Sequence, residues 1–203
     1  MLKILCNYII KFVDHGTLIK YIMNTCKYYR INVIKYLHKK IKLSEKDFQS
    51  KYTYIICDVD CIDVVKYLHK YIGFKKDYFH LENNQALPWF CIKGNINVVK
   101  YLHKYIGLTK ENFQSRNNEA CRWACGGGYL KVVKYLHKEV KLEKEDFRSN
   151  NSIVCQFSCE EGNIDIVKYL HEEIGLTKED FQKNNNKSYQ CASNNGHNFY
   201  WKF

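Results

Sequence analysis

The chain of 203 residues is 46% hydrophobic with a mean hydropathy of −0.47, a composition sufficient for a folded core. Its net charge of +11 comes almost entirely from lysine, and Lys, Asn, Ile, Tyr and Phe are abundant together, as in proteins of AT-rich genomes, so basicity alone is a weak indication of nucleic-acid binding. No run approaches the roughly 18 consecutive apolar residues that a membrane-spanning helix requires, so we expect no membrane segment.

The N-terminal segment, residues 1–20, is predicted to be an amphipathic helix that caps the first repeat. Leu2 to Val13 is largely apolar, but Lys3, Asn7 and Lys11 interrupt it too often for the core of a signal peptide. We therefore expect an intracellular protein that is not secreted.

A short block of sequence then recurs along the chain. Val132 to His137 is a near copy of Val98 to His103, which lies 34 residues earlier, and further copies begin at Val33, Val64 and Ile166. A fixed period of this length indicates stacked copies of one supersecondary unit. We predict a single domain over residues 1–203, with repeats at about 21–50, 51–83, 84–117, 118–151 and 152–185 and a truncated repeat at 186–203.

Each unit is predicted to contain two helices and a capped helical turn, most clearly between residues 118 and 151. A short first helix over 120–125 ends at the triplet Gly126–Gly128. The second helix, 130–140, has an apolar stripe at helical spacing and lysines on the opposite face. The closing segment, 142–147, begins like a helix N-cap and ends on a phenylalanine that we expect to be buried. The equivalent phenylalanines are Phe48, Phe79, Phe113, Phe147 and Phe181.

The repeated histidines and cysteines invite a metal hypothesis, which geometry disfavours. Helices pack about 8–10 Å apart, whereas histidines that share zinc need Zn–N distances of about 2 Å. The pairs Cys121/Cys125 and Cys155/Cys159 lack the spacing of a zinc knuckle, and their recurrence indicates packing as free, reduced thiols. We predict no metal and no cofactor. The recurring positions are His38, His69, His103, His137 and His171, and Cys26, Cys57, Cys91, Cys125 and Cys159.

The sequence from Glu119 to Leu136, E-A-C-R-W-A-C-G-G-G-Y-L-K-V-V-K-Y-L, resembles the ankyrin repeat pattern T-P-L-H-x-A-A-x-x-G-H-L-x-V-V-x-x-L. The resemblance extends over residues 20–203. It implies an all-α, ankyrin-type repeat solenoid that is not an enzyme and that serves as a scaffold or adaptor for protein–protein interaction.

Two departures from the family pattern limit what can be carried over. Pro88, Arg122 and Gln156 stand where the family has histidine in the first helix. Short helical turns of the type Leu176 to Phe181 replace the β-hairpins between repeats, so binding through hairpin tips is not implied. This lysine- and asparagine-rich variant is similar to ankyrin proteins encoded by giant DNA viruses of amoebae, which implies a host protein as partner and the host cytoplasm as location.

No catalytic constellation is separable from the repeat background. The triplet Gly126–Gly128 lacks the GxxxxGK[ST] pattern of a phosphate-binding loop and occupies a turn position in each repeat. We therefore predict that the protein is not an enzyme.

Two columns of equivalent residues are candidate binding sites. The first occupies a variable position that faces the concave groove in the family, and it either binds a partner or packs between first helices. It comprises Ile55, Trp89, Trp123 and Phe157. The second lies on the outer face of the second helices and suits an acidic partner or nucleic acid, or is a solvated face diluted by acidic residues in the adjoining turns. It comprises Lys35, Lys66, Lys100, Lys134 and Lys168.

Two alternatives to protein recognition remain. The lysine column would suit a basic, nucleic-acid- or virion-associated structural protein. Self-assembly through the C-terminal repeat is the other, because the aromatic segment Asn198 to Phe203 leaves apolar surface where a capping repeat normally presents polar residues.

Overall fold

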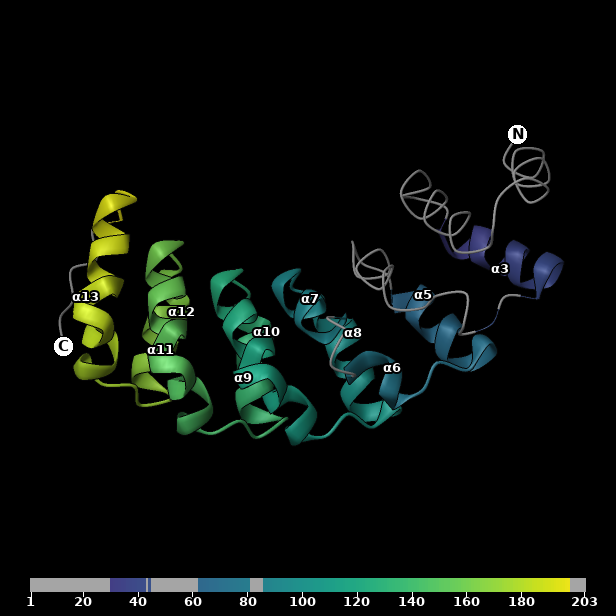
Figure 1. Ribbon diagram of the computed structural model, residues 1–203, viewed down its shortest axis with the longest axis horizontal. Helices are drawn as coiled ribbons and strands as arrows, with labels where there is room; N and C mark the ends of the chain where they lie inside the picture. The colour runs from purple at the N-terminus through teal and green to yellow at the C-terminus, as the bar shows by residue number, and fades with distance from the viewer. Residues whose placement is uncertain (1–29, 43, 45–61, 81–85, 198–203) are drawn as a thin grey trace. The chain divides into compact units, whose positions relative to one another are not determined.

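The computed structural model describes residues 30–42, 44, 62–80 and 86–197 (Figure 1). These residues form helices and turns, with no strand among them. They belong to two compact units, residues 1–86 (unit 1) and 87–203 (unit 2), which are described separately. The predicted N-terminal cap, Ile55 and the segment Asn198 to Phe203 lie outside the described residues.

The described residues of unit 1 include two helices that correspond to the predicted second helix of a repeat. The first is α3 (Arg30–Ile41), and the second is α5 (Ile62–Tyr67), which continues as the π-helix η3 (Leu68–Ile72). A short helix, α6 (Lys76–His80), follows and brings Phe79 into the interior. The core of unit 1 comprises Val33, Ile34, Leu37, Val64, Val65, Leu68, Phe74 and Phe79.

Unit 2 consists of first helices and second helices in alternation. The first helices are α7 (Ala86–Ile92), α9 (Lys110–Gly126), α11 (Lys144–Glu160) and α13 (Lys178–Asn194). The second helices are α8 (Ile96–Tyr101) with its π-helical continuation η4 (Leu102–Ile106), α10 (Leu130–Lys138) and α12 (Ile164–Glu172). Within unit 2, α9, α11 and α13 lie side by side and pack in sequence order (Figure 1). The predicted all-α repeat solenoid is confirmed.

The second helices form because their apolar and charged residues separate onto two faces. In α10, Val132, Val133 and Leu136 are fully buried, whereas Lys131 and Lys134 are exposed. Burial of such a stripe supplies most of the stability of so short a helix. The predicted helix 130–140 is confirmed, apart from its end at Lys138 with Glu139 as C-cap.

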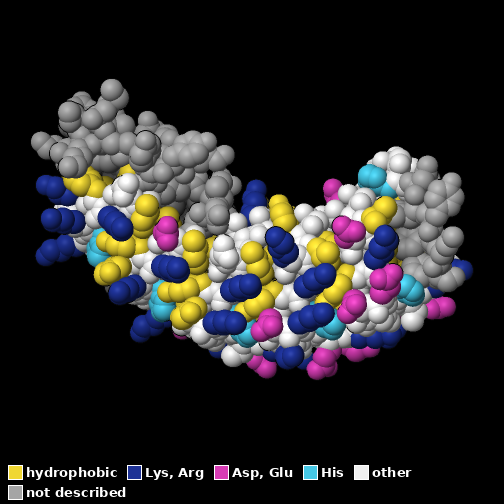
Figure 2. Space-filling view, turned by 180° about the vertical axis from the view of Figure 1, so that it is seen from behind, with side chains coloured by type: hydrophobic (Ala, Val, Ile, Leu, Met, Phe, Trp, Pro, Cys, Tyr) yellow, Lys and Arg dark blue, Asp and Glu magenta, His cyan; other side chains and the backbone are white. Residues whose placement is uncertain are grey.

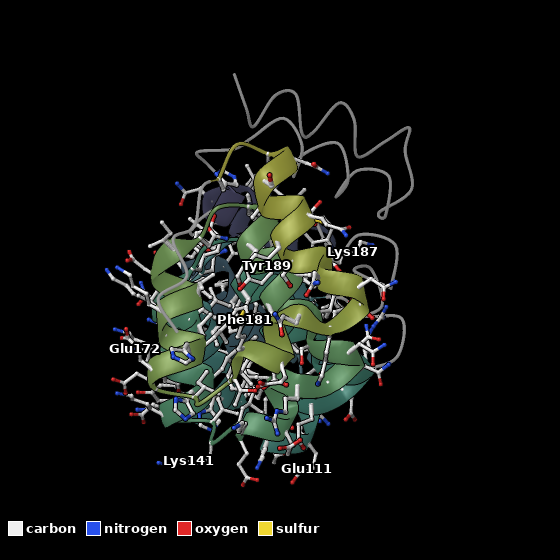
Figure 3. All side chains as sticks on the ribbon, turned by 90° about the vertical axis from the view of Figure 1, so that its left-hand side faces the viewer. Glu111, Lys141, Glu172, Phe181, Lys187 and Tyr189 are labelled. Atoms are coloured by element: carbon white, nitrogen blue, oxygen red, sulfur yellow. The ribbon has the colours of Figure 1, made fainter. Side chains whose placement is uncertain are left out.

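The capped turns begin the long first helices. In each of three turns, the backbone N–H of the N-cap residue donates to a side chain three residues later, as from Thr177 to Asp180 Oδ2 at 2.9 Å. The phenylalanine that follows is buried, and Figure 3 shows Phe181 inside the stack, with Glu111, Lys141 and Glu172 at its edge. The equivalent bonds run from Thr109 to Asn112 and from Glu143 to Asp146, and the equivalent buried residues are Phe113 and Phe147.

Each of the helices α9, α11 and α13 is interrupted after the capped turn with which it begins. In α11, Asn150, Asn151 and Ser152 all have positive φ, between 53° and 56°. Asparagine visits this left-handed region more readily than other residues with a side chain. The joins that the sequence shows only as polar are therefore single left-handed turns. The other two comprise Arg116, Asn117 and Asn118, and Asn184, Asn185 and Asn186.

An equivalent position in the repeats, four residues after the repeated histidine, offers a test of backbone strain. Gly73, Gly107 and Gly175 occupy it with φ of 92°, 80° and 79°, but Lys42 and Lys141 hold it with φ of 52° and 67°. The left-handed region costs a residue with a Cβ about 1–2 kcal/mol, which glycine avoids. We expect Lys141→Gly to raise the free energy of unfolding, measured in urea, by about 1 kcal/mol. An unchanged or lower value would contradict this prediction.

Candidate functional site

The described part of the first column lies on three successive first helices of unit 2. We call Trp89 on α7, Trp123 on α9 and Phe157 on α11 the aromatic column, and all three are partly exposed. The rings of Trp89 and Trp123 contact edge to face, with centroids 5.5 Å apart at 67°. Phe157 lies beside Gly126, where an added Cβ would be 3.5 Å away. The column therefore packs between neighbouring first helices and also reaches the surface, so the two interpretations are compatible.

Polar side chains beside the aromatic column replace the family's first-helix histidine. Arg122 Nη2 donates to the carbonyl of Arg116 at 3.0 Å, and Gln190 Nε2 donates to that of Asn185 at 3.0 Å. Both acceptors belong to left-handed turns, so these side chains tie each turn to the helix that it precedes. Lys93 contacts the column as well, with Nζ 5.9 Å from the centroid of the Trp89 ring.

The residues of the lysine column lie on second helices of both units, and each of the five is exposed. Lys134 Nζ lies 5.3 Å from the ring centroid of Tyr169 in the following repeat, a cation–π distance. The charge of Lys134 thus remains accessible while its ammonium group contacts the tyrosine ring. The same contact joins Lys35 to Tyr67 and Lys100 to Tyr135, each at 5.7 Å. The sequence gives no sign of this partner because it lies one repeat away.

Three of the repeated histidines contact these same tyrosines. His103 Nδ1 and the Tyr135 hydroxyl are 2.9 Å apart, and the rings meet edge to face. Burial lowers the pKa of His103, and so does the charge of Lys104, so the folded state favours the neutral ring. The equivalent pairs, also at 2.9 Å, are His38 with Tyr67 and His137 with Tyr169. We call these three pairs the His–Tyr ladder.

Removing one hydroxyl from the ladder should weaken the contact between two repeats. We expect Tyr135→Phe to lower the free energy of unfolding by about 1 kcal/mol, because His103 loses its hydrogen-bond partner while the ring packing is kept. A double-mutant cycle with His103→Phe measures the coupling. Strict additivity of the two substitutions would show that the bond contributes nothing.

Acidification should weaken the same ladder. Burial lowers the pKa of His103 and His137 below 6.5, as do Lys104 and Lys138. A lowered folded pKa means that the unfolded chain binds more protons, so this stability is complete above about pH 6.5 and is lost as the pH falls. We expect urea midpoints to drop between about pH 7.5 and about pH 5.5, and to drop less in a His103→Gln, His137→Gln variant. Equal drops in both proteins would exclude the ladder as the cause.

The arrangement of these helices and turns identifies the family. Helix pairs of unit 2 stack with a turn glycine of positive φ between first and second helix, at Gly94, Gly128 and Gly162. A family model of ankyrin repeats, in three copies, matches residues 22–146. The chain belongs to the ankyrin repeat family. No curated protein matches it, and neither does any solved structure. Ankyrin repeats are generally protein–protein interaction modules and typically non-catalytic scaffolds.

The cysteines of the ankyrin first helices lie in the core. Cys91, Cys121, Cys125, Cys155 and Cys159 are buried and free, and burial raises the pKa of Cys159 to about 12. A thiol kept protonated in this way is a poor nucleophile at neutral pH. Among residues 30–42, 44, 62–80 and 86–197, no group of three or more His, Cys, Asp or Glu side chains could hold a metal ion.

A second polar ladder joins the capped turns of this ankyrin array. Arg148 donates to Asp180 Oδ2 from Nε at 3.1 Å and from Nη2 at 3.0 Å, and Lys183 Nζ lies 3.1 Å from Oδ1. Burial raises the pKa of Asp180, but hydrogen bonds from the Thr177 N–H, Arg148 and Lys183 outweigh it and bring the pKa to about 2. One repeat earlier, Gln114 donates to Asp146 at 2.7 Å. These contacts hold neighbouring repeats together.

Within the described ranges, none of the helices is both long and apolar enough to span a membrane.

Proposed function

We propose that this ankyrin protein is a non-catalytic recognition scaffold whose aromatic column binds a partner protein. The observation that carries the proposal is the contact between Trp89 and Trp123, two tryptophans that are only partly buried. Tryptophan is among the residues that most often dominate the free energy of protein association, especially where its ring is already held in place.

The helices beneath the aromatic column support a preformed surface. Cys91, Ala124, Cys125 and Cys159 are fully buried under it, and small side chains at these positions let neighbouring first helices approach closely. A surface fixed before association loses less conformational entropy on binding, which favours affinity.

We further propose that the protein is viral, that the partner is a host protein and that the protein acts inside the cell. The lysine- and asparagine-rich composition supports the viral origin, and the buried free thiols in equivalent positions support a reducing compartment. The protein would then serve as an adaptor or decoy in the host cytoplasm.

Self-association through residues 186–203 is a separate proposal, which sedimentation at several concentrations would test.

The experiment compares capture of partners from an amoebal extract by three full-length proteins, followed by mass spectrometry and a binding titration with the purified partner. We expect the wild type and Tyr105→Ala to retain the partner, and the double variant Trp89→Ala/Trp123→Ala to bind it at least tenfold more weakly, about 1.4 kcal/mol. Circular dichroism should show that the double variant is folded with a modest loss of stability, about 1 kcal/mol for the ring contact. Equal binding by all three proteins would refute the proposal, and unfolding of the double variant would assign these residues to the core.

A further inference from the structure

A second surface of unit 2 combines lysines with an exposed, stacked tyrosine. The π-helix η4 presents Tyr105 at 71% exposure, the highest among the large hydrophobic side chains of the described residues. Its ring stacks on that of Tyr101, with centroids 5.1 Å apart and planes at 24°. The ring of Tyr105 is thus oriented by a neighbour and still open to solvent.

Exposed lysines lie on the helices that carry this stack and on the neighbouring second helix. Lys100 and Lys104 flank it on α8 and η4, and α10, which contacts α8, adds Lys131, Lys134 and Lys138. We call these five lysines with Tyr101 and Tyr105 the lysine–tyrosine face. Figure 2 shows the side that carries the row of histidines, where dark-blue Lys and Arg side chains alternate with yellow hydrophobic ones.

Two carboxylates moderate the charge of this face. Glu139, the C-cap residue of α10, is exposed close to the ladder, and Glu173 lies 3.9 Å from Lys138 Nζ at the far edge. Lys100 is held over the Tyr135 ring and Lys134 over the Tyr169 ring, so two of the five ammonium groups have fixed positions. The five lysines outnumber the two carboxylates, so the net charge of the face remains positive.

The same combination occurs independently in unit 1. There η3 presents Tyr71 at 55% exposure, its ring centroid 4.8 Å from that of Tyr67, with Lys70 Nζ 5.3 Å from the Tyr71 ring. Both π-helices have the sequence Leu-His-Lys-Tyr-Ile, whereas α10 and α12 carry glutamate at the tyrosine position and no π-helical turn. Single π-helical turns are frequent at functional sites.

We propose that the lysine–tyrosine face binds single-stranded nucleic acid. Lysines in fixed positions neutralise backbone phosphates, and an exposed aromatic ring is a platform on which a base stacks without regard to its identity. A base can stack on the open ring of Tyr105 while its backbone phosphates meet the lysines, and this combination is why the geometry points to nucleic acid. This activity goes beyond the recognition of a protein by the aromatic column, and it uses the second helices instead of the first.

The test is fluorescence anisotropy of the full-length protein with labelled oligo(dT) of about 20 nucleotides, titrated at several salt concentrations. We expect Tyr105→Ala to weaken binding about tenfold and Tyr105→Phe to bind like the wild type, because phenylalanine keeps the stacking face. Lys104→Gln should reduce the slope of log affinity against log salt by about 0.7. Since Tyr105 and Lys104 are exposed, these variants should fold normally.

A matched control separates this site from a general effect of lost charge. Lys178→Gln removes an exposed lysine at the start of α13 and should leave the salt slope and affinity unchanged. Oligo(dT) binding that is insensitive to Tyr105→Ala, or no binding at low salt, would overturn the proposal. A competition with polyglutamate provides a further control. If polyglutamate at equal charge concentration displaced the oligonucleotide equally well from the wild type and from Tyr105→Ala, the proposal would be overturned in favour of an acidic protein partner.

Discussion

Gly94→Ala is expected to be among the most destabilising single substitutions in unit 2, lowering the free energy of unfolding by about 3 kcal/mol. Gly94 has φ of 68°, and a Cβ there would overlap the Tyr129 ring of the next repeat, with Cγ only 2.6 Å away. Backbone strain and overpacking both contribute to the loss. Urea denaturation of the full chain measures it.

Gly107→Ala separates the two contributions, because Gly107 has φ of 80° but nothing within 4 Å of an added Cβ. It should cost only the backbone term, about 1 kcal/mol. Tyr129→Ser in the Gly94→Ala background should recover part of the loss by removing the overlapping ring. Equal losses at Gly94 and Gly107, with no recovery, would show that contact between repeats at this turn is unimportant.

Asp180→Asn should be the second large effect, with a loss of about 2 kcal/mol. Asp180 is 3% exposed and accepts hydrogen bonds from the Thr177 N–H, Arg148 and Lys183, so an amide leaves two cations beside a neutral group. Asp146→Asn is the matched control, since Asp146 is bound by the neutral Gln114 instead of an arginine. Its loss should be about half as large.

The pH dependence identifies the carboxylate as the cause. The folded pKa of Asp180 is about 2, below its ordinary value of 3.8, so its contribution is complete above about pH 4 and is lost as the pH falls towards 2. The free energy of unfolding should therefore fall less between about pH 4 and about pH 2 in Asp180→Asn than in the wild type. If the free energy of unfolding fell equally with pH in both proteins, groups other than Asp180 would be responsible for the loss of stability.

The period, the helix pair and the capped turn could be predicted from the sequence because each depends on local spacing. The apolar stripe of α10 and the buried Phe147 follow directly from residues a few positions apart. The left-handed joins could not be predicted as such, although the doubled asparagines, as at Asn150 and Asn151, were a usable signal for positive φ.

The candidate sites depended on contacts between repeats, which local spacing does not show. The exposure of Lys134 was predictable from helical periodicity, but its position over Tyr169 was not. The histidines were assigned a structural or surface role by the distance between helices, and their tyrosine partners emerged only with the register of one repeat on the next. Tyr105 gave no signal in sequence because a lone exposed tyrosine is ordinary, and its stacking on Tyr101 is what gives it significance. Whether the aromatic column binds a partner remains a prediction.

The His–Tyr ladder has a consequence for how this chain can change length. His103 and His137 each find a tyrosine in the following repeat, and the repeat between them carries both halves of the pair, as Tyr135 and His137 do in α10. An in-frame duplication of one 34-residue segment would therefore create a new copy whose upper and lower edges already fit its neighbours. Unequal recombination within the gene could lengthen or shorten the array by whole units without a compensating substitution.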